Sequence, residues 1–182
     1  MKKKKIREHF YKYVIDHKGT PKKLKHFLKF ADLSKDDFHE KYSSLKEVEL
    51  DIWKSSLKDV LLCLNNSDDY DSYNHREKGL SFIYSWLEFM EQNKNYFRNC
   101  SNFSPIDFMS GSNGFKKILT KFAESLVQGG ISTQEFKDRG IPSKYMVNFF
   151  CGLFSMILKE WKCFPGKKKK KKKKKKKQEE FM

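Results

Sequence analysis

The side chains whose type and spacing suggest a binding chemistry lie between Thr20 and Lys41. This stretch carries lysine ammonium groups, which pair with phosphates, and hydroxyl, carboxylate and imidazole groups, which hydrogen-bond to phosphates or to base edges. We therefore expect contact with a nucleic acid, with an ordinary solvated helix face as the alternative. The candidate DNA contacts are Thr20, Lys22, Lys23, Ser34, Lys35, Asp36, Asp37, His39 and Lys41.

The charge balance changes along this stretch. Four lysines at positions 22–29 make its first part basic, whereas residues 35–41 are net negative because Asp36, Asp37 and Glu40 outnumber the two lysines there. Each neutralised phosphate strengthens DNA binding through counterion release, so the basic part is expected to supply affinity. Carboxylates accept hydrogen bonds from the amino group of cytosine, so the acidic part remains compatible with base recognition.

Other chemically active side chains form no catalytic or metal-binding pattern. The sequence has no HExxH motif, no nucleophile elbow, no P-loop and no GxGxxG motif. We therefore expect no enzymatic activity and no cofactor. The histidines, which lack metal-ligand spacing, are His9, His17, His26, His39 and His75. The cysteines, which are far apart and are expected to be reduced core thiols, are Cys63, Cys100, Cys151 and Cys163.

Most of the positive charge lies at the two ends of the chain. The eleven lysines from Lys167 to Lys177, with two following glutamates, account for +9 of the net charge of +16 and leave +7 for residues 1–166. Lys2–Lys5 could act as a flexible arm along a neighbouring DNA backbone or minor groove. No apolar run has the length of a membrane span or follows Lys2–Lys5 as in a signal peptide, so a cytoplasmic protein is expected.

Apolar residues recur with helical spacing, and a first helix is expected to bury Ile6, Phe10, Tyr13 and Val14 and to end near Gly19.

Capping residues place the next three helices. Thr20 is expected to cap a second helix with Pro21 at its first position, and Ser34 to cap a third. Ser44 and Glu47 form a capping box for a long fourth helix. The inward residues of the fourth helix are Val48, Ile52, Leu57, Val60, Leu61 and Leu64.

The second half continues the helical pattern. We expect a helix over 74–93, an irregular segment at 99–113, a helix over 115–127 that breaks at Gly129 and Gly130, and a last helix over 142–161. No run alternates with period two, so the sequence predicts an all-α protein.

The order helix, Gly-Thr, helix, LSKDDFHEKY, SS and long helix resembles the DNA-binding head of the tetracycline-repressor (TetR-like) family of transcriptional regulators. The similarity is strongest to a subgroup common in Bacteroidetes, through SSLKEVELDIW and YNHREKGLSFIYSWLEFMEQNKNYF, and covers residues 6 to about 100. The sequence departs from the family at four positions. Asp36 and Asp37 replace the usual Gly-Thr, His39 replaces a tyrosine, and Leu45 replaces a lysine that contacts DNA.

The resemblance implies a cavity for an apolar small-molecule effector among the helices of the second half. The residues expected to line it are Trp86, Phe89, Met90 and Phe122. Core packing is the alternative for each of these side chains, because large aromatic and thioether groups are commonly buried.

The last helix is apolar nearly all round and must be covered on more than one side. We expect it to pair with the same helix of a second copy and form a homodimer, with burial inside one subunit as the alternative. The expected interface residues are Tyr145, Phe149, Phe150, Leu153, Phe154, Ile157 and Trp161.

These features together predict three regions: a helix-turn-helix DNA-binding domain at 1–46, a helical ligand-binding and dimerisation domain at 47–166, and a lysine-rich tail at 167–182. The predicted function is that of a TetR-like regulator that binds operator DNA as a homodimer and responds to an apolar effector. The alternative is a lipid- or isoprenoid-binding accessory protein of the same fold that has lost sequence-specific DNA binding. A helical adaptor with neither activity is the third possibility.

Overall fold

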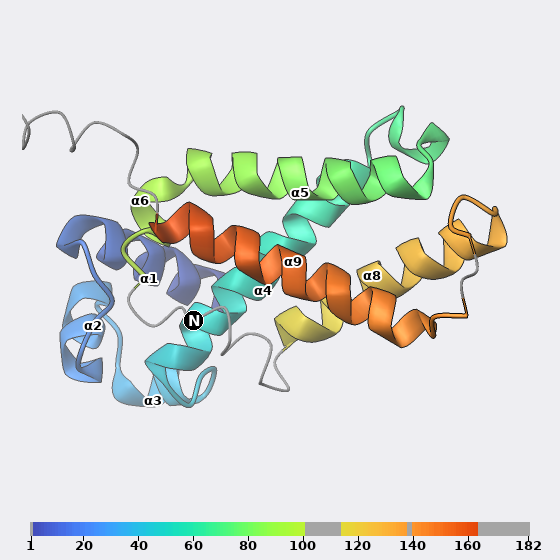
Figure 1. The fold of residues 1–182 in the computed structure, drawn as a ribbon. Coiled ribbons are helices and arrows are strands. Elements are labelled where there is room, and N and C mark those ends of the chain that lie inside the picture. Colours follow the sequence, from blue (N-terminus) through green and yellow to red (C-terminus); the bar gives the residue numbers. More distant parts are fainter. Residues whose placement is uncertain (1, 101–113, 138–139, 164–182) are drawn as a thin grey trace, which may run out of the picture.

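A computed structural model describes residues 2–100, 114–137 and 140–163, which form helices and no strand (Figure 1). This confirms the predicted all-α class. The expected tail at 167–182 and residues 101–113 of the expected irregular segment lie outside the described residues. The helices are α1 (Lys3–His17), α2 (Leu24–Ala31), α3 (Lys35–His39), α4 (Leu45–Asn65), the 3-10 turn η1 (Tyr70–Ser72), α5 (His75–Gln92), α6 (Lys94–Phe97), α8 (Gly114–Ser132) and α9 (Ser143–Cys163).

The first three helices pack around a small aromatic core. Ile6 and Phe10 of α1 are buried, as predicted, and α1 packs against both α2 and α4. The ring of Phe27 meets those of Phe10 and Phe38 edge to face, at centroid distances of 5.6 and 6.1 Å. These rings hold α2 and α3 at a defined angle, because edge-to-face contacts are directional.

The turn between α2 and α3 is as tight as predicted, but α2 begins later than expected. Asp32 ends α2 in the left-handed conformation, with φ of 47°, and Ser34 caps α3. The N-cap of α2 is Lys23, so the expected start at Thr20 and Pro21 is wrong. The reason is tertiary packing: Pro21 is itself buried before the helix, which starts only where its apolar face meets α1.

The helix α4 connects the first three helices to the rest of the protein. It packs against α1 and also against α5 and α8 (Figure 1). Four of its predicted inward residues are buried, while Leu61 and Leu64 are only partly buried. Trp53 of α4 and Trp86 of α5 lie 6.2 Å apart, at the centre of the core.

The helix α8 does not break at its two glycines, as the sequence suggested, but continues through them to Ser132. The glycines instead make room for two rings. A Cβ atom added to Gly129 would overlap the imidazole of His75, and one added to Gly130 would overlap the ring of Phe136. Both glycines are therefore places of close approach.

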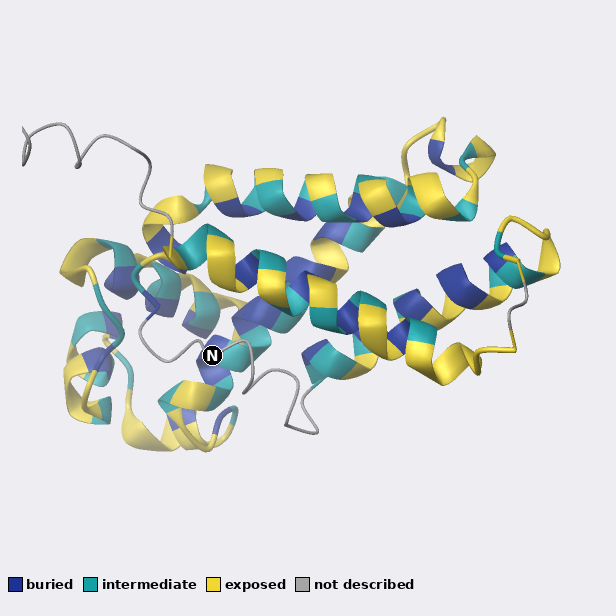
Figure 2. Cartoon of the chain, in the orientation of Figure 1, coloured by how far each residue is buried: buried dark blue, intermediate teal, exposed yellow. Residues whose placement is uncertain are grey.

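The helix α9 lies along α8 and exposes one of its two apolar faces (Figure 2). Its inner face buries Val147, Cys151, Phe154 and Leu158. Within the described residues, no helix has the length and apolar character needed to cross a bilayer.

The four cysteines are free thiols, but only Cys100 and Cys151 are buried. Cys63 and Cys163 are exposed, so the expectation that all four are core residues is wrong for these two.

Candidate nucleic-acid interface and ligand pocket

The start of α3 is organised by its N-cap. The hydroxyl of Ser34 accepts a hydrogen bond from the backbone N–H of Asp37 and donates one to the Asp37 carboxylate, at 3.1 and 2.6 Å. Asp37 thus serves its own helix, since an N-cap and a carboxylate in the first turn both satisfy the unpaired N–H end. Asp36 is exposed beside it.

The solvent-facing surface of α3 carries mixed charge. Lys35, Asp36 and His39 are exposed, and the ring of His39 packs edge to face on Phe38 at 5.5 Å. Just beyond α3, the ammonium group of Lys41 donates to the carboxylate of Glu40 at 2.5 Å. This hydrogen bond lowers the pKa of Glu40 and reduces the charge that Lys41 can offer to a phosphate.

The residues that lead into α2 supply positive charge next to α3. Lys22 and Lys23 are exposed, and Thr20 is half-buried. All nine candidate DNA contacts therefore keep at least partial access to solvent.

A shallow hollow lies on the side of α1 and α2. Its walls are Tyr13, His17, His26, Lys29 and Phe30. The ring of His17 stacks on Tyr13 at 4.0 Å and meets Phe30 edge to face at 5.5 Å. Sequence reasoning missed this hollow because its residues come from two helices.

The end of α3 is tied to α1 and α4 through one carboxylate. Asp51 accepts hydrogen bonds from the hydroxyl of Tyr42 at 2.8 Å and from the guanidinium of Arg7 at 2.9 Å. The ammonium group of Lys3 lies 4.8 Å above the ring of Tyr42. Burial, followed by the Asp51 hydrogen bond, raises the pKa of Tyr42.

The cap of α4 differs by one residue from the predicted capping box. Ser44 accepts from the backbone N–H of Glu47, as expected, but the Glu47 carboxylate accepts from the N–H and the hydroxyl of Ser43. The backbone hydrogen bond from Ser43 is the main reason that the pKa of Glu47 is lowered. Leu45 packs against the core.

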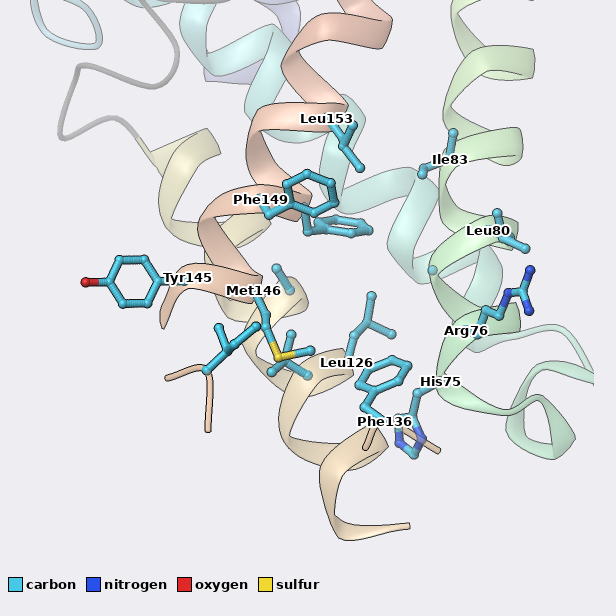
Figure 3. Close-up of a pocket in the computed structure, with 15 residues that line it drawn as sticks. His75, Arg76, Leu80, Ile83, Leu126, Phe136, Tyr145, Met146, Phe149 and Leu153 are labelled. Atoms are coloured by element: carbon cyan, nitrogen blue, oxygen red, sulfur yellow. The ribbon is translucent and has the colours of Figure 1, made fainter. Parts of the chain in front are cut away.

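A pocket of about 480 Å³ opens between α5, α8 and α9 (Figure 3). This volume lies within the usual range for small-molecule sites. Apolar side chains dominate its surface, and its polar side chains come from the start of α5 and from Tyr145. The lining residues are His75, Arg76, Gly79, Leu80, Ile83, Ala123, Leu126, Val127, Phe136, Ile141, Tyr145, Met146, Phe149, Phe150 and Leu153.

A clamp holds the segment after α8 against the start of α5. The carboxylate of Glu135 accepts from the backbone N–H of His75 at 2.8 Å, and its other oxygen lies 2.8 Å from Nδ1 of the same residue. The hydroxyl of Thr133 donates to this carboxylate at 3.0 Å. The hydrogen bond to the His75 side chain is the largest cause of the lowered pKa of Glu135. The clamp places Phe136 in the pocket wall.

The four residues predicted to line a ligand cavity do not line this pocket. Trp86 and Met90 are fully buried in the core, and Phe89 and Phe122 are half-buried against it. The ring of Phe122 lies 4.6 Å from that of Phe82. The periodicity identified the core-facing stripe of α5, whereas the pocket uses a second stripe on the same helix.

The predicted interface residues of α9 fall on different sides of the helix. Phe154 belongs to the core, whereas Phe150, Ile157 and Trp161 are half-buried. The ring of Trp161 lies 5.1 Å from the guanidinium carbon of Arg98. For Phe154, the structure therefore agrees with the alternative expectation, in which the residue is buried within one subunit.

The other predicted interface residues form an exposed apolar stripe. Tyr145, Phe149 and Leu153 have exposed fractions of 56%, 69% and 39%, and Met156 continues the stripe at 64%. An apolar surface of this kind marks a binding site for a ligand or a protein.

A buried polar cluster joins α4, α6 and the end of α9, and sequence reasoning missed it. Glu49 is 5% exposed, and burial raises its pKa against the opposing effect of Lys162. The ammonium group of Lys162 donates to the carbonyl of Cys100 at 2.7 Å. Among the described residues, one oxygen of Glu49 and the hydroxyl of Tyr96 are buried without a hydrogen-bond partner. The signal in the sequence for this cluster was Glu49, an acidic residue inside the apolar stripe of α4.

No protein-family model matches the chain, and no curated protein or solved structure matches it either.

Proposed function

We propose that the protein is a TetR-like transcriptional regulator that binds operator DNA as a homodimer and responds to an apolar effector. The observation that carries the proposal is a tight turn between α2 and α3, beside a body of helices that holds an apolar pocket. Two short helices joined in this way are typical of DNA-binding helix-turn-helix units.

In this proposal α3 enters the major groove and the lysines before α2 contact phosphates. The exposed surface of α3 offers Lys35, Asp36 and His39 to base edges. Lys22 and Lys23 supply the sequence-independent part of the affinity. Such a protein acts in the cytoplasm of a bacterium.

The helix α4 is the proposed route of communication. One part of it packs against α1, and other parts pack against α5 and α8, which form two walls of the pocket. A ligand that changes the separation of α5 and α8 also displaces α4. In a dimer this displacement changes the distance between the two copies of α3 and hence the affinity for a palindromic operator.

The exposed stripe on α9 is the proposed dimer surface. It presents Tyr145, Phe149, Leu153 and Met156 along one face of the helix. A two-fold symmetric pairing would cover the stripe of each copy with that of the other.

The test is selection of binding sites from a pool of random DNA duplexes. The protein is used with and without residues 167–182, because eleven lysines bind any DNA. We expect both forms to enrich the same palindrome, with half-sites about 10 base pairs apart. Failure of both forms to enrich any sequence at moderate salt would contradict the proposal.

The second candidate is a lipid- or isoprenoid-binding accessory protein of the same fold. It is favoured by the carboxylates of Asp36, Asp37 and Glu40, which are all exposed on or beside α3 and oppose approach to DNA. Its test is native mass spectrometry of the purified protein. A bound lipid, together with failure of the DNA selection, would support this function; an empty protein would contradict it.

A further inference from the structure

The pocket between α5, α8 and α9 has an uneven distribution of charge. Its interior is formed by aliphatic and aromatic side chains, whereas the imidazole of His75 and the guanidinium group of Arg76 come from the first turn of α5 (Figure 3). A ligand that fills the site must therefore be apolar over most of its length and polar at one end.

The carboxylates at this end of the pocket are already engaged. Glu135 accepts hydrogen bonds from His75 and Thr133, and Glu77 accepts from the backbone N–H of Asn74 in the capping box of α5. These groups leave little capacity to bind a ligand cation, since each carboxylate is held by donors of the protein.

Arg76 is the charged side chain of the pocket lining. It is exposed, and no carboxylate among the described residues forms an ion pair with it. A guanidinium group binds a carboxylate or phosphate through two parallel hydrogen bonds. The same group would repel a cationic ligand.

We propose that this pocket binds a single-chain amphipathic anion, with the alkyl chain between α5 and α9 and the carboxylate or phosphate head on Arg76. This inference rests on the proposed function only in using its effector pocket, and it does not require that α3 binds DNA. A chain in this position contacts Leu80 and Ile83 on one side and Phe149 on the other.

The experiment is isothermal titration of the full-length protein with four twelve-carbon probes below their micelle concentrations. The probes are dodecanoate, dodecyl phosphate, dodecanol and dodecyltrimethylammonium. We expect both anions to bind about tenfold more tightly than dodecanol, which corresponds to a charged hydrogen bond at a partly solvated site. The cation should bind most weakly. A difference between the two anions identifies the preferred head group.

Chain length tests the apolar part of the site. Affinity should rise about fourfold for each CH2 group between octanoate and dodecanoate, because each buried methylene contributes a similar transfer free energy. An affinity that does not depend on chain length would overturn the inference.

Variants locate the head group. Arg76→Gln should abolish the advantage of dodecanoate over dodecanol, and Arg76→Lys should keep part of it. Lys121→Gln, which removes an exposed cation of α8 outside the pocket, is the matched control and should change nothing. The lysine tail is present in every variant, so its attraction for anions cancels. Thermal melting checks that each variant folds.

The outcomes separate the inference from the proposed function. Equal binding of dodecanoate and dodecanol, unchanged by Arg76→Gln, overturns the anionic ligand but leaves the apolar effector pocket standing. Binding that survives Leu80→Glu, a change of a partly exposed pocket residue, places the ligand elsewhere and overturns the inference. No binding of any probe overturns the inference and removes support for an effector at this pocket, without bearing on DNA binding.

Discussion

The carboxylate of Asp51 on α4 links two other segments of the first part of the structure. It joins Arg7 of α1 to Tyr42, which follows α3, and so fixes the position of α3 relative to the long helix on which Asp51 lies. Asp51 can link these segments because a single carboxylate oxygen accepts hydrogen bonds from both Arg7 and Tyr42.

We expect Asp51→Asn to destabilise the fold by about 2 kcal/mol, since an amide replaces a carboxylate that accepts two partly buried hydrogen bonds. Urea unfolding followed by circular dichroism measures this change. Asp59→Asn, which alters an exposed residue of the same helix, is the control and should have little effect. Equal stability of the two variants would show that the network contributes nothing.

The buried carboxyl group of Glu49 predicts a dependence of stability on pH. Burial raises its pKa above the ordinary value of 4.5, so the folded state binds this proton more tightly than the unfolded state does. The resulting stabilisation is complete below pH 4.5 and is lost as the pH rises through the raised pKa. Glu47 and Glu135 have lowered pKa values and act in the opposite direction, as the pH falls below 4.5.

Glu49→Gln should therefore be at least as stable as the unchanged protein at pH 7, and its stability should vary less between pH 5 and pH 7. Thermal melts across this range measure the difference. Glu124→Gln, at an exposed position, should keep the original pH profile. Lower stability of Glu49→Gln than of the unchanged protein at pH 7 would show that the ionised carboxylate is the stabilising form.

The lysines that precede α2 allow a quantitative test of DNA contact. Replacing Lys22 with Gln should weaken binding to all sequences and reduce the slope of log affinity against log salt by about 1. Fluorescence anisotropy at several salt concentrations measures both. Lys58→Gln on the exposed side of α4 is the control, and an equal loss in the two variants would argue against a specific surface.

At the scale of elements, local signals predicted the boundaries that depend on a single hydrogen bond. Ser34 and Ser44 begin α3 and α4 because each hydroxyl accepts from the N–H three residues later. The predicted start of α2 was wrong because burial of Pro21 outweighed the local preference for Pro at the first helical position. A side-chain cap is therefore a stronger signal than a residue preference alone.

The pocket could not be predicted from periodicity. Its end is built by the hydrogen bonds from His75 to Glu135, which are 60 residues apart in sequence. Its wall also needs Gly129 and Gly130, which look like a helix break in sequence but are sites of close packing in the fold. Such pairings between distant elements leave no periodic signal along the chain.

Replacement of glycine by alanine is predicted to change the stability of the protein differently at Gly152 and at Gly130. Gly152→Ala on α9 should stabilise the protein by about 1 kcal/mol, because nothing lies within 4 Å of the added Cβ and alanine favours a helix. Gly130→Ala should fail to stabilise it, because the Cβ meets the ring of Phe136. Thermal melts at low protein concentration compare the stability of the two variants. An equal increase in melting temperature would contradict the close approach of Gly130 to Phe136.

At the scale of the whole molecule, α9 presents an exposed apolar face that includes Tyr145, Phe149, Leu153 and Met156. Phe149→Glu places a charge on the most exposed residue of the stripe and should shift the protein from dimer to monomer without loss of helix content. Analytical ultracentrifugation measures the change. Tyr84→Glu, on an equally exposed aromatic residue of α5, is the matched control. A monomeric starting protein would contradict the proposed dimer.

Tyr145, Phe149 and Leu153 belong both to the pocket wall and to the exposed stripe of α9. A molecule held in the pocket would alter the very surface offered to a second copy, so occupancy and self-association would be thermodynamically linked. The half-saturating ligand concentration would then depend on how much of the protein is present. A cell could therefore tune the sensitivity of the response simply by changing the abundance of this chain.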